Sequence, residues 1–401
     1  MYFKSIFYSL KNFLACNYIL IVKIDDMRPT KAIINLFSLK KNFINIRKQV
    51  SKAKVMAVVK ADAYGHGVKS VVDTLNSLGK QKPEYFAVAT ADEGIELRKI
   101  GVKQPILIFD PIDEEQIYKY FKYDLIPAVF NKDHLKTLTK GRGKINPTNN
   151  SAINVHVKID TGMNRLGVDY NNALEFISIL SKDSDFFIDG IFTHFATSDV
   201  KNSSYAKLQN KRFNSLINQL KSRNIKYGLA HAANSGAIID YPEAYFDMVR
   251  PGISLYGYYP SLQTSESIKL YPVMSLVSKV LTVKTIKRGE SVSYSRRYFA
   301  KKETKIISVP IGYADGFTRA LTNKAKAIIK GKIYNQVGTV TMDRIMFDVG
   351  NDNINVGDKV ILLGSQGKLH IDAWDWGRIL KTIPYEVTCG ISKRVPRVIK
   401  N

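Results

Sequence analysis

The feature that most constrains the fold of this chain is a regular alternation of strand-like and helix-like segments between about residues 39 and 258. Short apolar runs rich in β-branched residues predict eight buried strands, at residues 55–59, 85–89, 105–109, 125–130, 152–159, 187–195, 227–232 and 245–249. Helical apolar spacing predicts the intervening helices, at residues 39–53, 68–78, 92–100, 113–121, 132–139, 171–180, 204–222 and 235–239. Parallel strands joined by right-handed helical crossovers produce this pattern, and eight units predict an α/β fold of the (β/α)8 TIM-type barrel.

The pattern changes after Tyr259 and Pro260. Short strand-like runs divided by Gly, Asn and Asp follow, at residues 273–286, 304–311, 325–334, 336–341, 345–348 and 359–363, with one good helix at residues 372–381. A chain of 401 residues exceeds the size at which one core keeps growing. We therefore expect a barrel at residues 27–260 and a mostly antiparallel β domain at residues 261–401. The polar segment 141–151 is expected to be a long surface loop of the barrel.

Residues 1–26 are interpreted separately. Their apolar run, residues 13–22, is shorter than the roughly 20 residues that a membrane span requires. Lys4 and Lys11 precede it as in a signal peptide, but no convincing cleavage site follows, and a second methionine, Met27, opens the regular pattern. We interpret residues 1–26 as a disordered extension or a start-site artefact, with targeting as the alternative.

Composition limits the possible partners. The formal net charge is +25, but the lysines are scattered along the chain and no nucleic-acid motif accompanies them, so a nucleic-acid partner is not expected. The charge does favour small anionic ligands. Cys16 and Cys389 lie far apart in the sequence and the histidines show no ligand spacing, which indicates a reducing, cytoplasmic location and no metal.

One lysine stands at a position where barrels collect catalytic groups. The run Lys54-Val-Met-Ala-Val-Val-Lys60 ends in a loop that contains Gly65 and Gly67. Lys60 is thus expected at the carboxyl end of a buried strand, the edge at which barrel active sites form. A lysine that merely extends its charge to water is the alternative interpretation.

A phosphate site is predicted at the last two strands of the barrel. Asn234, Ser235 and Gly236 follow the seventh predicted strand, and Gly252 and Ile253 follow the eighth. In such barrels these loops commonly cradle a phosphate with backbone N–H groups and a hydroxyl, and glycine allows close approach of the backbone. The alternative is that both are ordinary turns.

Five motifs carry a resemblance to a known family. They are Met27-Arg-Pro-Thr30, Val58-Val-Lys-Ala-Asp-Ala-Tyr-Gly-His-Gly67, Lys158-Ile-Asp-Thr-Gly-Met-Asn-Arg-Leu-Gly167, Arg250-Pro-Gly-Ile-Ser-Leu-Tyr-Gly257 and Ile311-Gly-Tyr-Ala-Asp-Gly316. Together they resemble the alanine racemases, which use pyridoxal phosphate. The resemblance implies a cytoplasmic homodimer that interconverts L- and D-alanine and supplies D-alanine for cell-wall peptidoglycan.

The resemblance also implies a two-base mechanism. Lys60 would carry pyridoxal phosphate as a Schiff base, or aldimine, and serve as the base on one face of the substrate. Tyr294, from the second domain of the partner subunit, would be the base on the other face, although its ordinary pKa of about 10 must be lowered or the step concerted. Arg165 would bind the substrate carboxylate, together with the backbone N–H of the partner's Met342.

Further residues are assigned by the resemblance to the cofactor and its surroundings. Tyr64 and Tyr385 would contact the phosphate, His194 the ring and Arg250 the pyridine nitrogen. Three residues would have a supporting role: His231, Tyr313 and Lys158. His231 would hold Arg250. Lys158 would hold Arg165 as a carbamate, but as a free lysine it would repel Arg165.

The chain departs from the common family pattern in three places. Ser295-Arg296-Arg297 follows Tyr294 where glycine is usual, Thr341 precedes Met342 where cysteine is frequent, and an extension precedes Met27. The first departure changes the width and charge of the substrate entrance. The rival functions are a racemase of broader range, a decarboxylase of the related two-domain group, which Arg250 disfavours, and a protein that only carries the cofactor.

Overall fold

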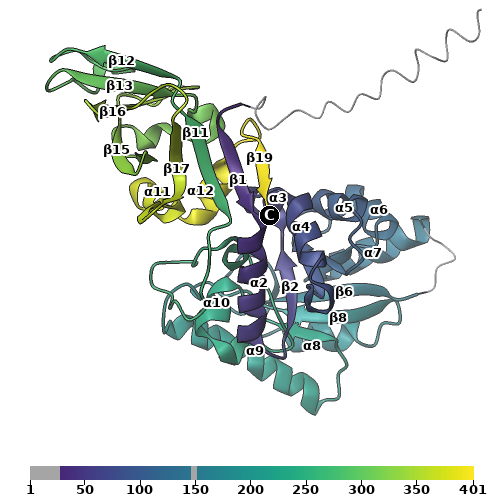
Figure 1. Cartoon of the computed structure of the whole chain (residues 1–401). Coiled ribbons are helices and arrows are strands. Elements are labelled where there is room, and N and C mark those ends of the chain that lie inside the picture. Colours follow the sequence, from purple (N-terminus) through teal and green to yellow (C-terminus); the bar gives the residue numbers. More distant parts are fainter. Residues whose placement is uncertain (1–27, 146–150) are drawn as a thin grey trace, which may run out of the picture.

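The computed structural model describes residues 28–145 and 151–401. The predictions for residues 1–26, and the part of the expected loop at residues 146–150, lie outside the described residues. Two bodies make up the molecule, a barrel surrounded by helices and a domain built on a second sheet, and the carboxyl end of the chain lies between them (Figure 1).

The barrel is closed, as the sequence predicted. Its eight parallel strands are β2 (Lys54–Val58), β3 (Tyr85–Val88), β4 (Ile106–Ile108), β5 (Ile126–Val129), β6 (Ile153–Asp160), β8 (Phe186–Phe192), β9 (Leu229–His231) and β10 (Met248–Val249). The sheet order is β5-β4-β3-β2-β10-β9-β8-β6, and pairing of β5 with β6 closes the ring. A short strand, β7 (Val168–Asp169), pairs with β6 outside it. Both sides of these strands are covered, which explains their continuous apolar runs.

Helices surround the barrel and connect its strands. They are α2 (Leu36–Val50), α3 (Lys60–Gly65), α4 (Val68–Asn76), α5 (Ala91–Lys99), α6 (Ile117–Lys122), α7 (Lys132–Ile145), α8 (Ala173–Leu180), α9 (Ser204–Ser222) and α10 (Ser235–Asp240). Helix α5 begins with a capping box formed by Thr90 and Glu93. The prediction of a loop from residue 141 was wrong at its start, because α7 continues to Ile145. Gly141 can lie in this helix because it packs against Ile117 and Phe121, where a larger side chain would collide.

The second sheet is mostly antiparallel, as predicted. Its order is β12-β13-β16-β15-β14-β17-β11-β1-β19, and β18 pairs with β17. The strands are β11 (Met274–Lys279), β12 (Thr282–Ile286), β13 (Thr304–Val309), β14 (Lys326–Ile329), β15 (Lys332–Val337), β16 (Ile345–Gly350), β17 (Lys359–Gln366), β18 (Leu369–Ile371), β1 (Lys31–Asn35) and β19 (Arg397–Lys400). Besides the predicted helix, found as α11 (Ala373–Leu380), a short helix that the sequence analysis missed, α12 (Pro384–Gly390), packs against α3.

Strand β1 belongs to the second sheet although it precedes the barrel in sequence. It pairs antiparallel with β11 and parallel with β19. Strands β1 and β19 come from opposite ends of the chain. The residues just before it are also bound to the second domain: the Thr30 hydroxyl donates to the Pro310 carbonyl at 2.6 Å, and Arg28 forms an ion pair with buried Asp315. The second domain is therefore assembled from both ends of the chain.

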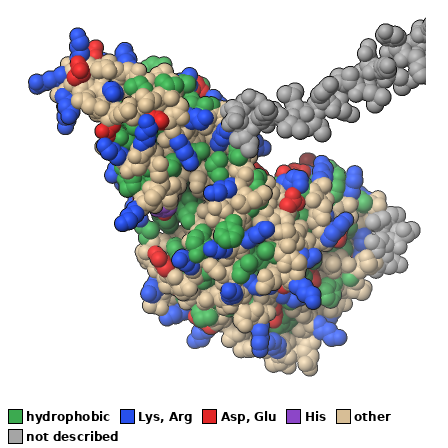
Figure 2. All heavy atoms as spheres, in the orientation of Figure 1, with side chains coloured by type: hydrophobic (Ala, Val, Ile, Leu, Met, Phe, Trp, Pro, Cys, Tyr) green, Lys and Arg blue, Asp and Glu red, His purple; other side chains and the backbone are tan. Residues whose placement is uncertain are grey.

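The surface bears out the scattered distribution of lysine and arginine. Figure 2 shows these side chains spread over both bodies on the face it presents, with no single basic patch. Among the described residues, no helix has the length and apolar character needed to cross a membrane.

Candidate active site

Lys60 lies at the mouth of the barrel, immediately after β2. The turn that it begins is left-handed: Ala61, Asp62, Ala63 and Tyr64 have φ values of 53°, 52°, 54° and 55°. Residues with side chains rarely adopt this conformation, and each one costs of order 1–2 kcal/mol. A run of four therefore persists only because the surroundings hold it in place.

Hydrogen bonds and packing hold this turn. The Ala61 N–H donates to the Glu93 carboxylate at 2.6 Å, and the Val68 N–H donates to the Asp62 carboxylate at 2.7 Å. Gly65 ends the turn with φ 81°, and a Cβ there would lie 2.3 Å from the Thr388 carbonyl oxygen on α12. The second domain thus locks the loop that carries Lys60.

A cavity of about 340 Å³ opens at this mouth. It brings together most of the residues that the sequence analysis assigned to the cofactor and substrate, namely Lys60, Tyr64, Lys158, Arg165, His194, Asn234, Ser235, Arg250, Gly252, Ile253 and Tyr385. It also has walls that the sequence analysis missed, including Val58, Ala89, Phe109, Asp110, Leu166 and Phe192. Several of these lie at or just after barrel strand ends, the positional signal that could have found them.

Arg250 is fixed inside the barrel as a buried cation. Its guanidinium donates to the Thr193 carbonyl at 2.7 Å, to the Ala232 carbonyl at 3.0 Å and to His231 Nδ1 at 2.9 Å. Burial lowers the pKa of Arg250 to about 9, so the side chain remains charged at neutral pH. The Phe192 ring packs beside it, with 5.4 Å between the ring centroid and the guanidinium carbon. His231 does not line the cavity itself but is hydrogen-bonded to Arg250, which does.

Lys158 is also buried at the mouth, on β6. Burial, and then the charges of Arg165 and Arg250, lower its pKa to about 8. At pH 7 about a tenth of this amine is therefore uncharged, far more than for an ordinary lysine, and the uncharged form is the one that can react with carbon dioxide.

Hydroxyl and N–H groups gather where the sequence predicted a phosphate. The Ser235 hydroxyl oxygen accepts from the Gly252 N–H at 2.9 Å and from the Ser254 N–H at 3.3 Å. A Cβ at residue 252 would lie 2.5 Å from the Tyr64 hydroxyl oxygen, so only glycine fits. Burial raises the pKa of both Tyr64 and Tyr385, whose rings lie 5.9 Å apart, so both hydroxyls stay protonated as donors. Neutral hydroxyl and N–H donors gathered in this way suit a phosphate group.

Asn234 has a local role in the same region. Its side-chain oxygen accepts from the Ala237 N–H at 3.1 Å and from the Ser198 hydroxyl at 2.7 Å. It thereby caps α10 and fixes Ser235 beside Gly252.

Besides His231, three predicted residues are absent from the cavity lining. Tyr294, Tyr313 and Met342 lie on loops of the second domain and are 72%, 42% and 51% exposed. The Tyr313 N–H donates to the Thr341 carbonyl at 3.0 Å, so two of these loops are joined, and the Thr339 hydroxyl donates to the Tyr294 carbonyl at 2.7 Å. The backbone of these loops is held in place, but the three side chains do not line the cavity of their own chain.

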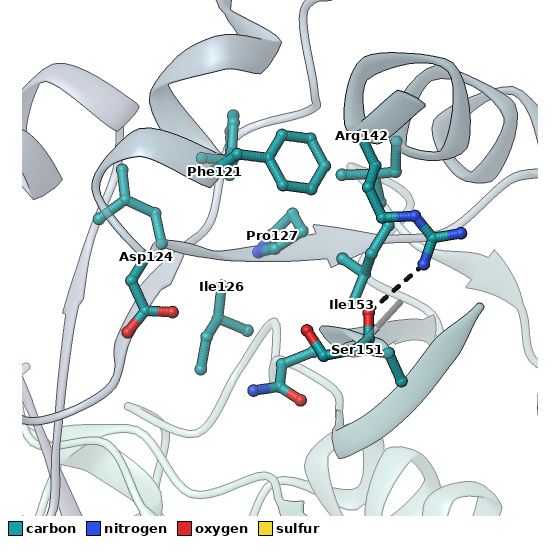
Figure 3. A pocket seen from close by; sticks show the side chains of 12 residues that line it. Phe121, Asp124, Ile126, Pro127, Arg142, Ser151 and Ile153 are labelled. Carbon is teal, nitrogen blue, oxygen red and sulfur yellow. Dashed lines mark hydrogen bonds between the residues drawn. The ribbon is translucent and has the colours of Figure 1, made fainter. Parts of the chain in front are cut away.

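A second cavity, of about 180 Å³, lies at the opposite rim of the barrel, between α6, α7 and the beginnings of β5 and β6 (Figure 3). Its one arginine, Arg142, contacts the Ser151 carbonyl oxygen and forms an ion pair with Asp185. Of the two cavities, the one at Lys60 has the titratable groups that a reaction needs. Elsewhere in residues 28–145 and 151–401, no group of three or more His, Cys, Asp or Glu side chains could hold a metal ion.

The fold and the cavity define a class of protein: a two-domain barrel whose mouth holds two lysines, two arginines and a set of hydroxyl and N–H donors suited to an anionic ligand. Comparison with known proteins narrows this class. Residues 34–260 match the family model of the alanine racemase N-terminal domain, and residues 273–399 match that of the C-terminal domain. The chain belongs to the alanine racemase family, which consists of isomerases, and the resemblance drawn from its motifs is confirmed.

Individual relatives agree with this assignment. Alanine racemase 2 of Caldanaerobacter subterraneus subsp. tengcongensis is 42% identical over 377 residues, which are 93% of this chain and 95% of the relative. The structure of alanine racemase from Clostridium difficile 630 is 37% identical, has a TM-score of 0.85 and covers 93% of this chain and 96% of its own. A histidine racemase from Leuconostoc mesenteroides subsp. sake is also similar, at 27% identity and a TM-score of 0.84, over 93% of this chain and 98% of its own.

Proposed function

We propose that this protein racemises alanine with pyridoxal 5'-phosphate bound at Lys60. The observation that carries the proposal is the single cavity that unites Lys60, Arg250 and the donors around Ser235. When bound, the cofactor supplies an electron sink for the charge that forms at the α carbon when its proton is removed. The remaining tasks of binding, orientation and proton movement fall to residues of this chain.

Different residues of the cavity would hold different parts of the cofactor. Lys60 would hold it covalently, while Ser235, the Gly252 N–H and the hydroxyls of Tyr64 and Tyr385 would hold its phosphate. Arg250 would face the ring nitrogen, and His194 would contact the ring. Because a guanidinium does not readily give up a proton, the ring nitrogen would stay unprotonated. A ring with an unprotonated nitrogen withdraws electrons less strongly. This weaker electron sink favours return of the proton to the α carbon over transamination or decarboxylation.

The substrate would be oriented at its carboxylate by Arg165. We propose that Lys158 holds Arg165 in place as a carbamate. The support for this is its buried amine, which lies beside two arginines and has a pKa of about 8. As a carbamate the group is an anion, so that it attracts Arg165 instead of repelling it.

Proton transfer on the second face requires another copy of the chain. Lys60 can reach only one face of a planar centre, and Tyr294 does not line the cavity of its own chain. We propose a homodimer in which each second domain presents Tyr294, Met342 and Tyr313 to the partner's cavity. In this arrangement residues 27–260 hold the cofactor and residues 261–401 supply the second base, with Tyr385 reaching its own barrel.

The biological setting follows from the reaction. D-alanine produced in this way would supply cell-wall peptidoglycan. We propose a cytoplasmic location, supported by the two cysteines, Cys16 and Cys389, which lie far apart in the sequence.

The decisive experiment uses the full-length protein. It should show the visible absorbance of lysine-bound pyridoxal phosphate and convert either enantiomer of alanine to the racemate, followed by optical rotation. Lys60→Ala should lose both the absorbance and the activity. A colourless parent protein, or a Lys60→Ala variant with full activity, contradicts the proposal. Lys48→Ala, on the outer surface of α2, is the matched control.

A racemase of broader range is the second candidate. The similarity to a histidine racemase favours it, because this two-domain architecture also occurs in a protein named for a larger substrate. Rates with alanine, serine and histidine separate the two functions. Alanine preferred by more than about tenfold in kcat/KM, the scale of discrimination that side-chain size allows, supports an alanine racemase.

A further inference from the structure

A chain of buried polar groups runs from the cavity down through the barrel. Arg250 contacts His231 Nδ1 at 2.9 Å, His231 Nε2 contacts His156 Nδ1 at 2.9 Å, and His156 Nε2 contacts the Asp189 carboxylate at 3.0 Å. The Tyr85 hydroxyl donates to the same carboxylate at 3.1 Å. Both imidazoles are fully buried, so these contacts are their principal polar interactions. Neither His156 nor Asp189 was singled out from the sequence.

The backbone is shaped to make this chain possible. The pairing of β6 with β8 shifts register between Val155 and His156. Val155 pairs with Ile188 and His156 pairs with Gly190, so Asp189 has no paired residue on β6. Such a bulge redirects a side chain, and here it coincides with the Asp189 contact to His156. The next residue is Gly190, where a Cβ would lie 2.5 Å from the His156 ring. The bulge and the glycine together provide the carboxylate and the space for the imidazole.

The donors and acceptors can be arranged in only one direction. Arginine has no acceptor, so His231 Nδ1 must offer its lone pair to Arg250, which places the His231 proton on Nε2. That proton is donated to His156 Nδ1, and the His156 proton therefore lies on Nε2 and is donated to Asp189. An ionised carboxylate accepts only, so the far end requires the same arrangement. Burial opposes ionisation of Asp189, but the hydrogen bonds from His156 and Tyr85 leave its pKa below the ordinary value.

We propose that Asp189 is a positioning residue for the cofactor site, acting on Arg250 through His156 and His231. The carboxylate fixes the proton of each histidine on Nε2, so that His231 always presents an acceptor to Arg250. Without that anion, His156 could carry its proton on Nδ1, His231 would turn its own proton toward Arg250, and the guanidinium would lose its partner. This inference rests on the proposed function for the identity of the group that Arg250 faces.

The direct test is the tautomeric state of the histidines in the full-length protein. The chain has 6 histidines, few enough to resolve by proton–nitrogen correlation spectroscopy of ¹⁵N-histidine-labelled protein, with and without pyridoxal phosphate. Two buried imidazoles should carry their protons on Nε2, with hydrogen-bonded signals protected from exchange. If either His156 or His231 carries its proton on Nδ1, or if either is an imidazolium, the proposal is overturned.

A variant links the chain to the cofactor. Asp189→Asn should weaken pyridoxal phosphate binding roughly tenfold, as losses of an outer hydrogen-bond partner do, and should shift the absorbance maximum of the bound cofactor. The matched control is Asp185→Asn, just before the same strand, whose carboxylate pairs with Arg142 away from the histidines. A merely structural role of Asp189 would lower thermal stability but leave the absorbance maximum and the tautomers unchanged, and that result overturns the proposal.

Gly190→Ala provides a second variant that keeps the carboxylate. Its added methyl group must displace the His156 ring, so it should produce the same spectral shift as Asp189→Asn. A parent protein that binds no pyridoxal phosphate would contradict the proposed function, whereas the tautomers of the cofactor-free chain would still test the role of Asp189.

Discussion

The predicted site is divided between two regions that differ in burial. Most of its residues at the barrel mouth are buried or half-buried, whereas its residues on the loops of the second domain are exposed. At the mouth, Arg250 is 3% exposed and surrounded by protein acceptors, and Lys158 is 6% exposed. On the loops, Tyr294 is 72% exposed and its side chain makes no hydrogen bond within residues 28–145 and 151–401, although its backbone carbonyl accepts from the Thr339 hydroxyl. Both regions carry residues that the family resemblance assigned to the same reaction.

Under the proposed function, this difference means that one chain can bind the cofactor but cannot complete the reaction. The mouth is preorganised at Arg250, because a buried charge is tolerated only with fixed partners. The loops remain open because their partner surface is supplied by a second chain under the proposed function. Changes at the mouth should therefore affect cofactor binding, and changes on the loops should affect turnover alone.

The largest effect is expected from Tyr294→Phe. Loss of the second base should reduce racemisation in both directions by roughly 100- to 10,000-fold, the usual contribution of a general base. The absorbance of bound cofactor should remain, because the cavity residues are unchanged. Chiral chromatography of alanine measures the rates. Unchanged rates would show that another group serves the second face.

Mixing variants tests whether Tyr294 acts across the dimer. Lys60→Ala and Tyr294→Phe chains, refolded together, form mixed dimers in which one of the two sites has both bases. About a quarter of the parent activity should return, given random pairing in a two-fold dimer. If Tyr294 served its own chain, every site would lack one base and the mixture would stay inactive.

A smaller effect, confined to binding, is expected from Gly252→Ala. The new methyl group collides with the Tyr64 hydroxyl, whose ring is stacked on Tyr256 at 4.8 Å. Overpacking of this kind costs about 1–3 kcal/mol, so the dissociation constant of pyridoxal phosphate should rise about tenfold. Titration of the cofactor-free protein measures it. Gly143→Ala on α7, where a Cβ meets nothing within 4 Å, is the control.

Lys158 makes stability depend on pH. Its pKa is lowered to about 8 in the folded protein, so between this value and the ordinary lysine pKa the unfolded chain binds more protons. The free energy of unfolding should therefore rise with pH above 8, by about 1–2 kcal/mol relative to Lys158→Met. Urea unfolding of cofactor-free protein in buffer freed of carbon dioxide measures it. A difference that stays flat from pH 7 to 10 would contradict the lowered pKa.

The smallest effect is expected at the exposed loop. Ser295 has φ 60°, in the left-handed region that glycine adopts most readily. Ser295→Gly should raise the free energy of unfolding by about 0.5–1 kcal/mol through relief of this strain. Ser215→Gly, in the middle of α9, should instead lower it, because glycine is unfavourable within a helix. Thermal unfolding compares the two, and a destabilised Ser295→Gly variant would contradict the prediction.

The sequence predicted the barrel well because local patterns determine it. Each strand from β2 to β10 is a short apolar run, and the loops after them carry Lys60, Ser235 and Gly252 at the expected edge. The second sheet was predicted as a class, but its membership was not. Strand β1 has the same local character as a barrel strand, and its partners β11 and β19 lie far away in the sequence.

Other features could not be predicted because tertiary contacts override local preference. Ala61, Asp62, Ala63 and Tyr64 give no local signal for a left-handed turn, which depends on Glu93 and α12. The role of Asp189 depends on a shift of register between two strands, and register is set by the whole barrel.

The position of β1 has a consequence for synthesis of the chain. A ribosome makes β1 first of the described strands, makes the entire barrel next, and makes β19 last. The barrel can close while β1 still lacks both of its neighbours. The second sheet, and with it the α12 contact that locks the Lys60 turn, is completed only when the final residues emerge. A chain that terminates before these residues would have β1 unpaired ahead of its barrel. Because unpaired strands promote association between chains, we expect such a fragment to aggregate and not to act as a partly active enzyme.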